Sequence, residues 1–136
     1  MIRVVLDTNI LISALLQPQG LPARIFLMTI AGTAAQLCVS GDVYAEYEEV
    51  VRSPKFNHTE TTIEHTLRAI RKSGHWVRPL GRVHACSDPD HDIFIECAQA
   101  AHAHYLITGN RKDFPAKWAD TQIVTPRQYV HAVADI

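Results

Sequence analysis

Length, composition and charge describe an ordinary folded domain. With 136 residues, of which 47% are apolar and 20% charged, the chain lies outside the range of disordered proteins, and it predicts a single domain over residues 1–136. The net charge of -1 excludes a surface that is basic throughout, although a local basic strip for nucleic acid is still allowed. Three cysteines without CxxC spacing exclude a disulfide framework and a zinc-ribbon site, so we expect a cytoplasmic protein. No apolar run is long enough to predict a membrane span.

The first half of the chain predicts strands that alternate with helices. Residues 2–6 form a short β-branched run without alternation, which is typical of a parallel strand covered on both faces. Asp7 ends this run, and Thr8 or Asn9 can cap the following helix. The elements expected here are a strand at 2–6, helices at 10–16 and 22–31, a strand at 36–39, and a helix that begins at 40–42, runs through 51 and ends near 53–54.

The second half continues the same alternation. Ile63, Leu67 and Ile70 are spaced four and three apart, which predicts an amphipathic helix over 59–72. Pro89 follows Asp88 and is typical of the first turn of a helix. The elements expected here are the helix at 59–72, a short strand at 76–78, a helix from 90 to about 103, a strand at 105–108, a loop at 109–115, a strand at 122–124 and a last helix from 126 to about 133. Such alternation predicts an α/β fold with a mostly parallel sheet.

Acidic and amide side chains follow the ends of the predicted strands. In an open α/β sheet, ligands bind where the carboxyl ends of the strands meet the loops and helix N-termini. We therefore expect these side chains to gather at one edge of the sheet. They are Asp7, Thr8 and Asn9 after the first strand, Glu46 in the helix after the second, Asp88, Asp90 and Asp92 at a helix start, and Thr108, Asn110 and Asp113 after a later strand.

Carboxylates that share one edge repel one another unless a cation lies between them. A hard divalent ion with oxygen ligands is the simplest cation for such a place, which predicts Mg²⁺ or Mn²⁺. Metal-assisted hydrolysis of phosphodiesters is the matching chemistry. The candidate metal ligands are Asp7, Glu46, Asp90 and Asp92; the candidate catalytic residues are these four with Asp113, and Thr8, Asn9, Thr108 and Asn110 are expected to orient the substrate.

Each of these residues also has a purely structural interpretation. Asp7 could cap a helix, and Glu46 alone would be an ordinary solvated acid of its helix. Asp88, Asp90 and Asp92 could be first-turn acids that the helix dipole favours. The Gly109-Asn110 dipeptide is typical of a turn, so Asn110 and Asp113 could belong to one.

The order of these segments resembles the PIN domain, in particular small bacterial and archaeal proteins classed as toxins of toxin–antitoxin pairs. Four segments carry the resemblance over nearly the whole chain. They are residues 4–14 (VVLDTNILISA), the helix with Glu46, residues 88–98 (DPDHDIFIECA), and residues 105–110 (YLITGN) running into 113–115 (DFP). The resemblance implies a three-layer α/β/α fold, Mg²⁺- or Mn²⁺-dependent cleavage of RNA, a small antitoxin partner and a homodimer or higher oligomer.

In this resemblance Asp7 and Glu46 match the first and second acids of the family. The third acid usually follows the Asp-Pro-Asp start directly, where this chain has His91, so Asp90 or Asp92 must replace it. The later Thr-Gly-acid position holds Asn110, with Asp113 nearby. Two alternatives to an active ribonuclease therefore stay open: a PIN-like binding or regulatory protein with weakened catalysis, and a phosphatase-like or receiver-like protein with an acidic Mg²⁺ pocket.

Overall fold

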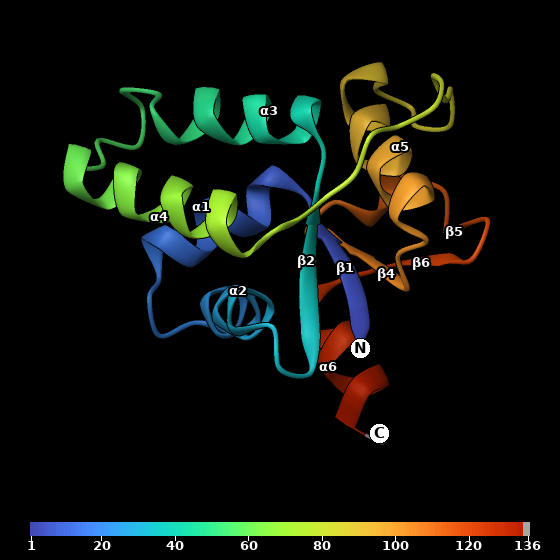
Figure 1. Cartoon of the computed structure of the whole chain (residues 1–136), viewed down its shortest axis with the longest axis horizontal. Helices are drawn as coiled ribbons and strands as arrows, with labels where there is room; N and C mark the ends of the chain where they lie inside the picture. The colour runs from blue at the N-terminus through green and yellow to red at the C-terminus, as the bar shows by residue number, and fades with distance from the viewer. Residues whose placement is uncertain (135–136) are drawn as a thin grey trace.

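The computed structural model describes residues 1–134 and shows one six-stranded sheet in the order β3-β2-β1-β4-β6-β5 (Figure 1). All neighbouring strands are parallel except β5 and β6, which pair antiparallel. The strands are β1 (Ile2–Leu6), β2 (Ala35–Val39), β3 (His75–Trp76), β4 (Tyr105–Ile107), β5 (Lys117–Trp118) and β6 (Thr121–Val124). The fold is an α/β three-layer sandwich with a mostly parallel central sheet, as predicted.

Helices cover both faces of the sheet. The helix α5 packs on β1, β2 and β4, whereas α2 and α4 pack on β2, and α6 packs on β4 and β6. In Figure 1, α1, α2 and α4 lie on one side of β1 and β2, and α5 lies on the other. The helices are α1 (Thr8–Leu16), α2 (Leu21–Ala31), α3 (Gly41–Val51), α4 (Glu60–Ser73), α5 (Asp92–Ala101) and α6 (Pro126–Ala134), with short 3₁₀ turns η1 (Pro89–His91) and η2 (Arg111–Asp113).

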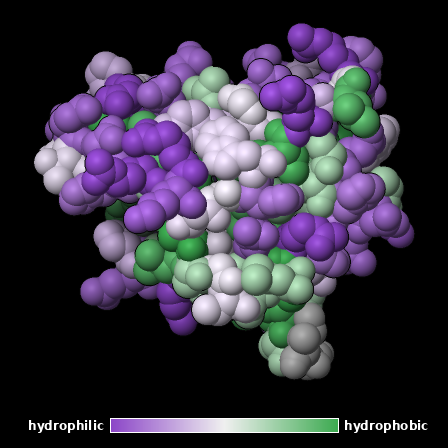
Figure 2. Space-filling model, viewed as in Figure 1, coloured by the Kyte–Doolittle hydropathy of each residue, from purple (hydrophilic) through white to green (hydrophobic). Residues whose placement is uncertain are grey.

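The central strands form the least solvent-accessible part of the molecule. Val4, Val5, Leu37 and Leu106 are fully inaccessible to solvent, because strands covered on both faces bury every side chain. The predicted amphipathic helix is confirmed in α4, which buries Ile63, Leu67 and Ile70 and turns its polar side outward, so the surface over α3 and α4 is largely hydrophilic in Figure 2.

The structure corrects three local predictions. Neither Thr8 nor Asn9 caps α1; Asp7 holds the N-cap position, without a side-chain hydrogen bond to the helix. The predicted helix from 90 begins instead as η1 and becomes α-helical at Asp92. The strand β5 was not predicted, because its two residues are held by an antiparallel pairing with β6 that no local pattern announces.

No single helix within residues 1–134 is long and apolar enough to cross a membrane. The helices α1 and α2 together have a suitable length and composition, but they meet at an angle of 110°.

Candidate active site

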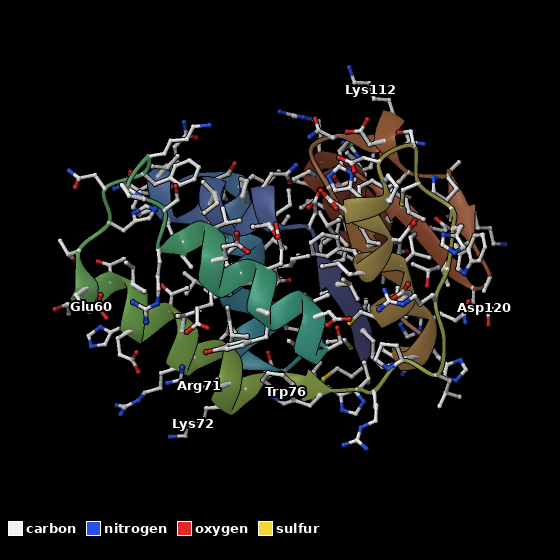
Figure 3. The ribbon with its side chains drawn as sticks, turned by 90° about the horizontal axis from the view of Figure 1, so that it is seen from above. Glu60, Arg71, Lys72, Trp76, Lys112 and Asp120 are labelled. Carbon is white, nitrogen blue, oxygen red and sulfur yellow. The ribbon has the colours of Figure 1, made fainter. Side chains whose placement is uncertain are left out.

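A cleft of about 340 Å³ opens at the carboxyl edge of the sheet, between α1 and α3. This is the place where an open α/β sheet binds ligands. Figure 3 looks onto this edge from above, with α3 crossing in front of the sheet. The cleft is lined by Asp7, Thr8, Asn9, Ile12, Ser13, Glu46, Val50, Phe56, His91 and Asn110.

Asp7 lies at the floor of this cleft, directly after β1. The parallel register pairs Leu6 with Ile107, so β1 and β4 end side by side, and the Asp7 N–H donates to the Ile107 carbonyl at 2.9 Å. The hydroxyl of Thr108 donates to the Asp7 carboxylate at 2.7 Å. Asp7 is 3% exposed, and this burial raises its pKa, although Thr108 and the nearby His91 act in the opposite direction.

Glu46 reaches the same cleft from α3. Two contacts fix this helix: the Ser40 hydroxyl caps it by accepting from the Val43 N–H at 3.2 Å, and the Tyr47 hydroxyl donates to the Leu6 carbonyl. Burial raises the pKa of Glu46, and the negative charges of Glu49, Asp7 and Asp90 raise it further, while the Thr8 hydroxyl lowers it. The carboxylates of Asp7 and Glu46, 39 positions apart in the chain, therefore repel each other across one cleft.

The acids of the segment 88–92 take three different roles. Asp88 is an N-cap, since its carboxylate accepts from the Asp90 N–H at 3.0 Å. Asp90 is exposed and close enough to Glu46 to raise the pKa of that residue. Asp92 is 6% exposed, and one of its carboxylate oxygens accepts from the backbone N–H groups of Ala85 and Cys86 at 3.0 and 2.9 Å.

Asp92 therefore fastens the loop before α5, and it is not among the residues that line the cleft. Burial by itself would raise the pKa of Asp92, but the two N–H donors outweigh it, and the pKa is lowered. The predicted ligand role of Asp92 has no geometric support within the described residues, whereas its alternative role at the helix start does.

The residues after β4 border the cleft on its far side. Thr108 contacts Asp7, and its hydroxyl also accepts from the Asn110 N–H at 3.0 Å. Asn9 accepts from the Gly109 N–H at 3.3 Å, which ties the start of α1 to this loop. Asp113 lies in η2 and is not among the residues that line the cleft; its backbone carbonyl accepts from the Ser87 N–H. The structure brings Asp7, Thr8, Asn9, Glu46 and Asn110 together at the cleft and leaves Asp90, Asp92, Thr108 and Asp113 outside its lining.

The cleft contains some of the oxygen ligands that a hard metal ion requires. Within residues 1–134, no three His, Cys, Asp or Glu side chains converge closely enough to hold an ion by themselves. The cleft nevertheless offers two carboxylates that repel each other and a buried Thr8 hydroxyl without a regular hydrogen-bond partner. These groups fit Mg²⁺ or Mn²⁺, because such ions keep several waters when one or two carboxylates bind them. The His91 Nδ1 atom is also buried without a partner, and its ring stacks on Phe114 with centroids 5.2 Å apart.

Four cleft residues were not predicted from the sequence. Ile12 and Ser13 follow Thr8 and Asn9 by one helical turn on α1, and Val50 follows Glu46 by one turn on α3. The i, i+4 spacing places each pair on one helix face, so this signal was present in the sequence. Phe56 comes from the loop after α3, and no local pattern indicates its place.

A larger groove of about 660 Å³ is lined in part by Asp42 and Glu96, and it contains none of the predicted site residues. It is formed by the start of α3 and the segment 76–82. Trp76 of this groove and Lys112 of η2 lie on opposite sides of the molecule in Figure 3. Chemistry, rather than size, therefore identifies the smaller cleft as the candidate active site.

Comparison with known proteins gives two matches. The family described as the PIN domain matches residues 3–112, which include both Asp7 and Glu46. An uncharacterized protein of Methanocaldococcus jannaschii is 30% identical over 113 residues, covering 81% of this chain and 72% of the relative.

Proposed function

The chain belongs to the PIN domain family, whose members are generally nucleases, and from this premise we propose that it is a metal-dependent endoribonuclease that hydrolyses RNA phosphodiester bonds. The observation that supports this proposal most is that the carboxylates of Asp7 and Glu46 line one cleft, where the negative charge of Asp7 raises the pKa of Glu46. Like charges at one site are stabilised when a divalent ion lies between them.

In the proposed mechanism Asp7 and Glu46 hold Mg²⁺ or Mn²⁺, with Asp90 close enough to add negative charge. The ion would polarise the phosphate and lower the pKa of a bound water. Thr108 orients the Asp7 carboxylate by its 2.7 Å hydrogen bond. The side chains of Asn9, Ser13 and Asn110 line the same cleft and offer neutral donors to phosphate oxygens.

The proposed biological role is that of a toxin neutralised by a small antitoxin protein, in a homodimer or higher assembly. This role is supported by the resemblance of four ordered segments to such toxins. Expression of the chain alone should arrest bacterial growth, and co-expression of the neighbouring gene product should restore it. Unimpaired growth with soluble wild-type protein would argue against the toxin role and leave the nuclease proposal standing.

A second candidate function is a PIN-like RNA-binding or regulatory protein with weak catalysis. It is favoured by His91, which lines the cleft at the position where the family resemblance leads one to expect an acid. Binding of RNA without cleavage under any divalent metal would support it.

The central test compares wild type with Asp7→Asn. We expect the variant to lose cleavage of a mixed RNA pool by at least about 100-fold while its circular dichroism is unchanged, because the substitution removes a charged metal ligand at nearly constant volume. The matched control is Asp120→Asn, which makes the same chemical change in the exposed turn between β5 and β6. Equal cleavage by Asp7→Asn and wild type would refute the assignment.

Metal replacement provides an independent test. Chelator-stripped protein should be inactive, and Mg²⁺ or Mn²⁺ should restore cleavage, whereas Zn²⁺ should not do so comparably, because the proposed ligands are hard oxygens. Single-turnover assays with each metal would measure this order. Cleavage that persists in chelator, or that zinc alone restores, would contradict the proposed site.

A further inference from the structure

The cleft has two chemically different ends. Thr8 and Asn9 on α1 and Glu46 on α3 lie at its acidic end, beside Asp7. One helical turn further along the same helices, the lining changes to Ile12, Ser13 and Val50. Phe56 completes this mostly apolar end. Side chains at i and i+4 are about 5–6 Å apart, which is comparable with the separation of phosphate and base within one nucleotide.

Phe56 is held in place but not fully buried. It packs against the small apolar cluster of Ile12, Val51, Ile63 and Leu67, while part of its surface faces the cleft. Its ring lies nearly parallel to that of His58, with an interplanar angle of 16° and centroids 6.1 Å apart. The ring therefore has packing partners on both the small cluster and His58, and part of its surface is open to the cleft.

Basic side chains stand at both ends of the cleft. The Lys55 ammonium lies 5.6 Å from the centre of the Phe56 ring. Arg111 and Lys112 follow Asn110 directly, and Figure 3 shows Lys112 projecting from that end of the molecule. Within residues 1–134 none of these three cations forms an ion pair with a carboxylate, so carboxylates do not neutralise their charges. Lys55 itself lies over the Phe56 ring.

From this arrangement we propose that Phe56 is the base-stacking platform of the active site, so that the cleft takes one unpaired nucleotide with its base on Phe56, Ile12 and Val50 and its phosphate at the acidic end. The proposal rests on the proposed nuclease function and specifies its substrate as an unpaired nucleotide. A base within a duplex cannot bind in this way, because its neighbours already cover both of its faces. The flanking phosphates of the strand would meet Lys55 on one side and Arg111 with Lys112 on the other.

The expected energetic effect is measurable. Stacking of a base on an aromatic side chain contributes about 1–3 kcal/mol, which corresponds to roughly 5- to 150-fold in affinity. Phe56→Leu keeps an apolar side chain in the small cluster but removes the aromatic face. It should weaken binding of a single-stranded oligoribonucleotide by a factor in this range, whereas Phe56→Trp should retain or strengthen it.

The test uses a single-stranded RNA that carries the fluorescent base 2-aminopurine, and binding is followed in the Asp7→Asn background without metal so that no cleavage occurs. Stacking on Phe56 should quench the fluorescence, and Phe56→Leu should remove the quenching. Trp76→Leu is the matched control, because Trp76 is an aromatic residue, 44% exposed, in the larger groove that contains none of the predicted site residues. A fully paired RNA of the same sequence should bind more weakly and should not be quenched.

Equal binding and quenching in Phe56→Leu, or loss of quenching in Trp76→Leu instead, would overturn the proposal. If Phe56→Leu does not fold, the wild type and Phe56→Trp are compared instead. Absence of 2-aminopurine quenching by both proteins would also overturn the proposal. Quenching that depends on Phe56, in a protein that cleaves no RNA under any metal, would uphold the platform and refute the nuclease function. The two proposals therefore fail separately.

Discussion

At the scale of single residues, acids with similar sequence contexts have different roles. Asp7 and Asp92 both stand at the start of a helix and are both buried, at 3% and 6% exposure. The Asp92 carboxylate receives two backbone N–H donors, which lower its pKa, whereas Asp7 receives one hydroxyl, which does not compensate for its burial. The Asp92 carboxylate is engaged in fixing a loop, whereas that of Asp7 lies in the lining of the cleft.

His91→Asp tests the position where the family resemblance leads one to expect the third acid. The added carboxylate would stand beside Asp7 and should tighten Mn²⁺ binding by on the order of tenfold, because affinity follows the number of charged ligands. Without metal the same change adds repulsion and should lower the melting temperature. Calorimetric Mn²⁺ titration and single-turnover cleavage would measure both effects. An unchanged or weaker affinity would mean that Asp90 already supplies the third charge.

At the scale of elements, the site depends on how two helices are fastened to the sheet. Ser40 caps α3, and Tyr47 binds the carbonyl of Leu6 just before Asp7, so α3 is fixed to the end of the strand that carries the first acid. The start of α5 is fastened differently, by the Asp92 carboxylate that gathers the loop before it.

Asp92→Asn should therefore act on stability rather than on metal binding. Loss of a charge-assisted pair of hydrogen bonds should lower the free energy of unfolding by about 1–3 kcal/mol at pH 7. Because folding lowers the pKa of Asp92, its stabilisation is complete above the ordinary aspartate pKa and is lost as the pH falls through the lowered value, so wild type and variant should converge in acid. Urea titrations at pH 7 and in acid would show this. A fall in Mn²⁺ affinity as large as that of Asp7→Asn would instead make Asp92 a ligand.

At the scale of the whole molecule, folding brings like charges together at a cost that a ligand can relieve. All of α1, α2 and β2 lie between Asp7 and Glu46 along the chain, and only the folded state places the two acids in one cleft. Burial raises the pKa of both, which means that their ionised forms disfavour folding at neutral pH. An ion that binds only the folded state stabilises it.

Mn²⁺ at 100 times its dissociation constant should therefore stabilise the wild type by about 2.7 kcal/mol and raise its melting temperature by several degrees. Asp7→Asn should show little of this increase, yet without metal it should unfold at the same or a higher temperature than wild type, because a neutral group replaces a buried charge. Thermal denaturation with and without Mn²⁺, with Asp120→Asn as the control, would measure both. A metal-free variant that melts well below wild type would contradict this account.

The sequence by itself determined the alternation of elements and the edge at which the acids would meet. A short run rich in β-branched residues, such as residues 2–6, is typical of a strand covered on both faces, and parallel strands place the residues after them at one edge. Local patterns were sufficient for this because hydrophobic periodicity and helix-start residues act over a few positions. Asp7, Glu46 and Asn110 could thus be expected at one site before their distances were known.

Only the tertiary structure decided what each carboxylate contacts. The partners of Asp92 are backbone groups of a loop without regular structure, and those of Asp7 depend on the register of β1 against β4. Neither Phe56 nor β5 has a local signal, because both are held by packing between distant segments. Hydrogen bonds and burial depend on three-dimensional proximity. The different roles of Asp7, a candidate metal ligand, and Asp92, which fixes a loop, therefore arise only from the packing of strands, loops and helices.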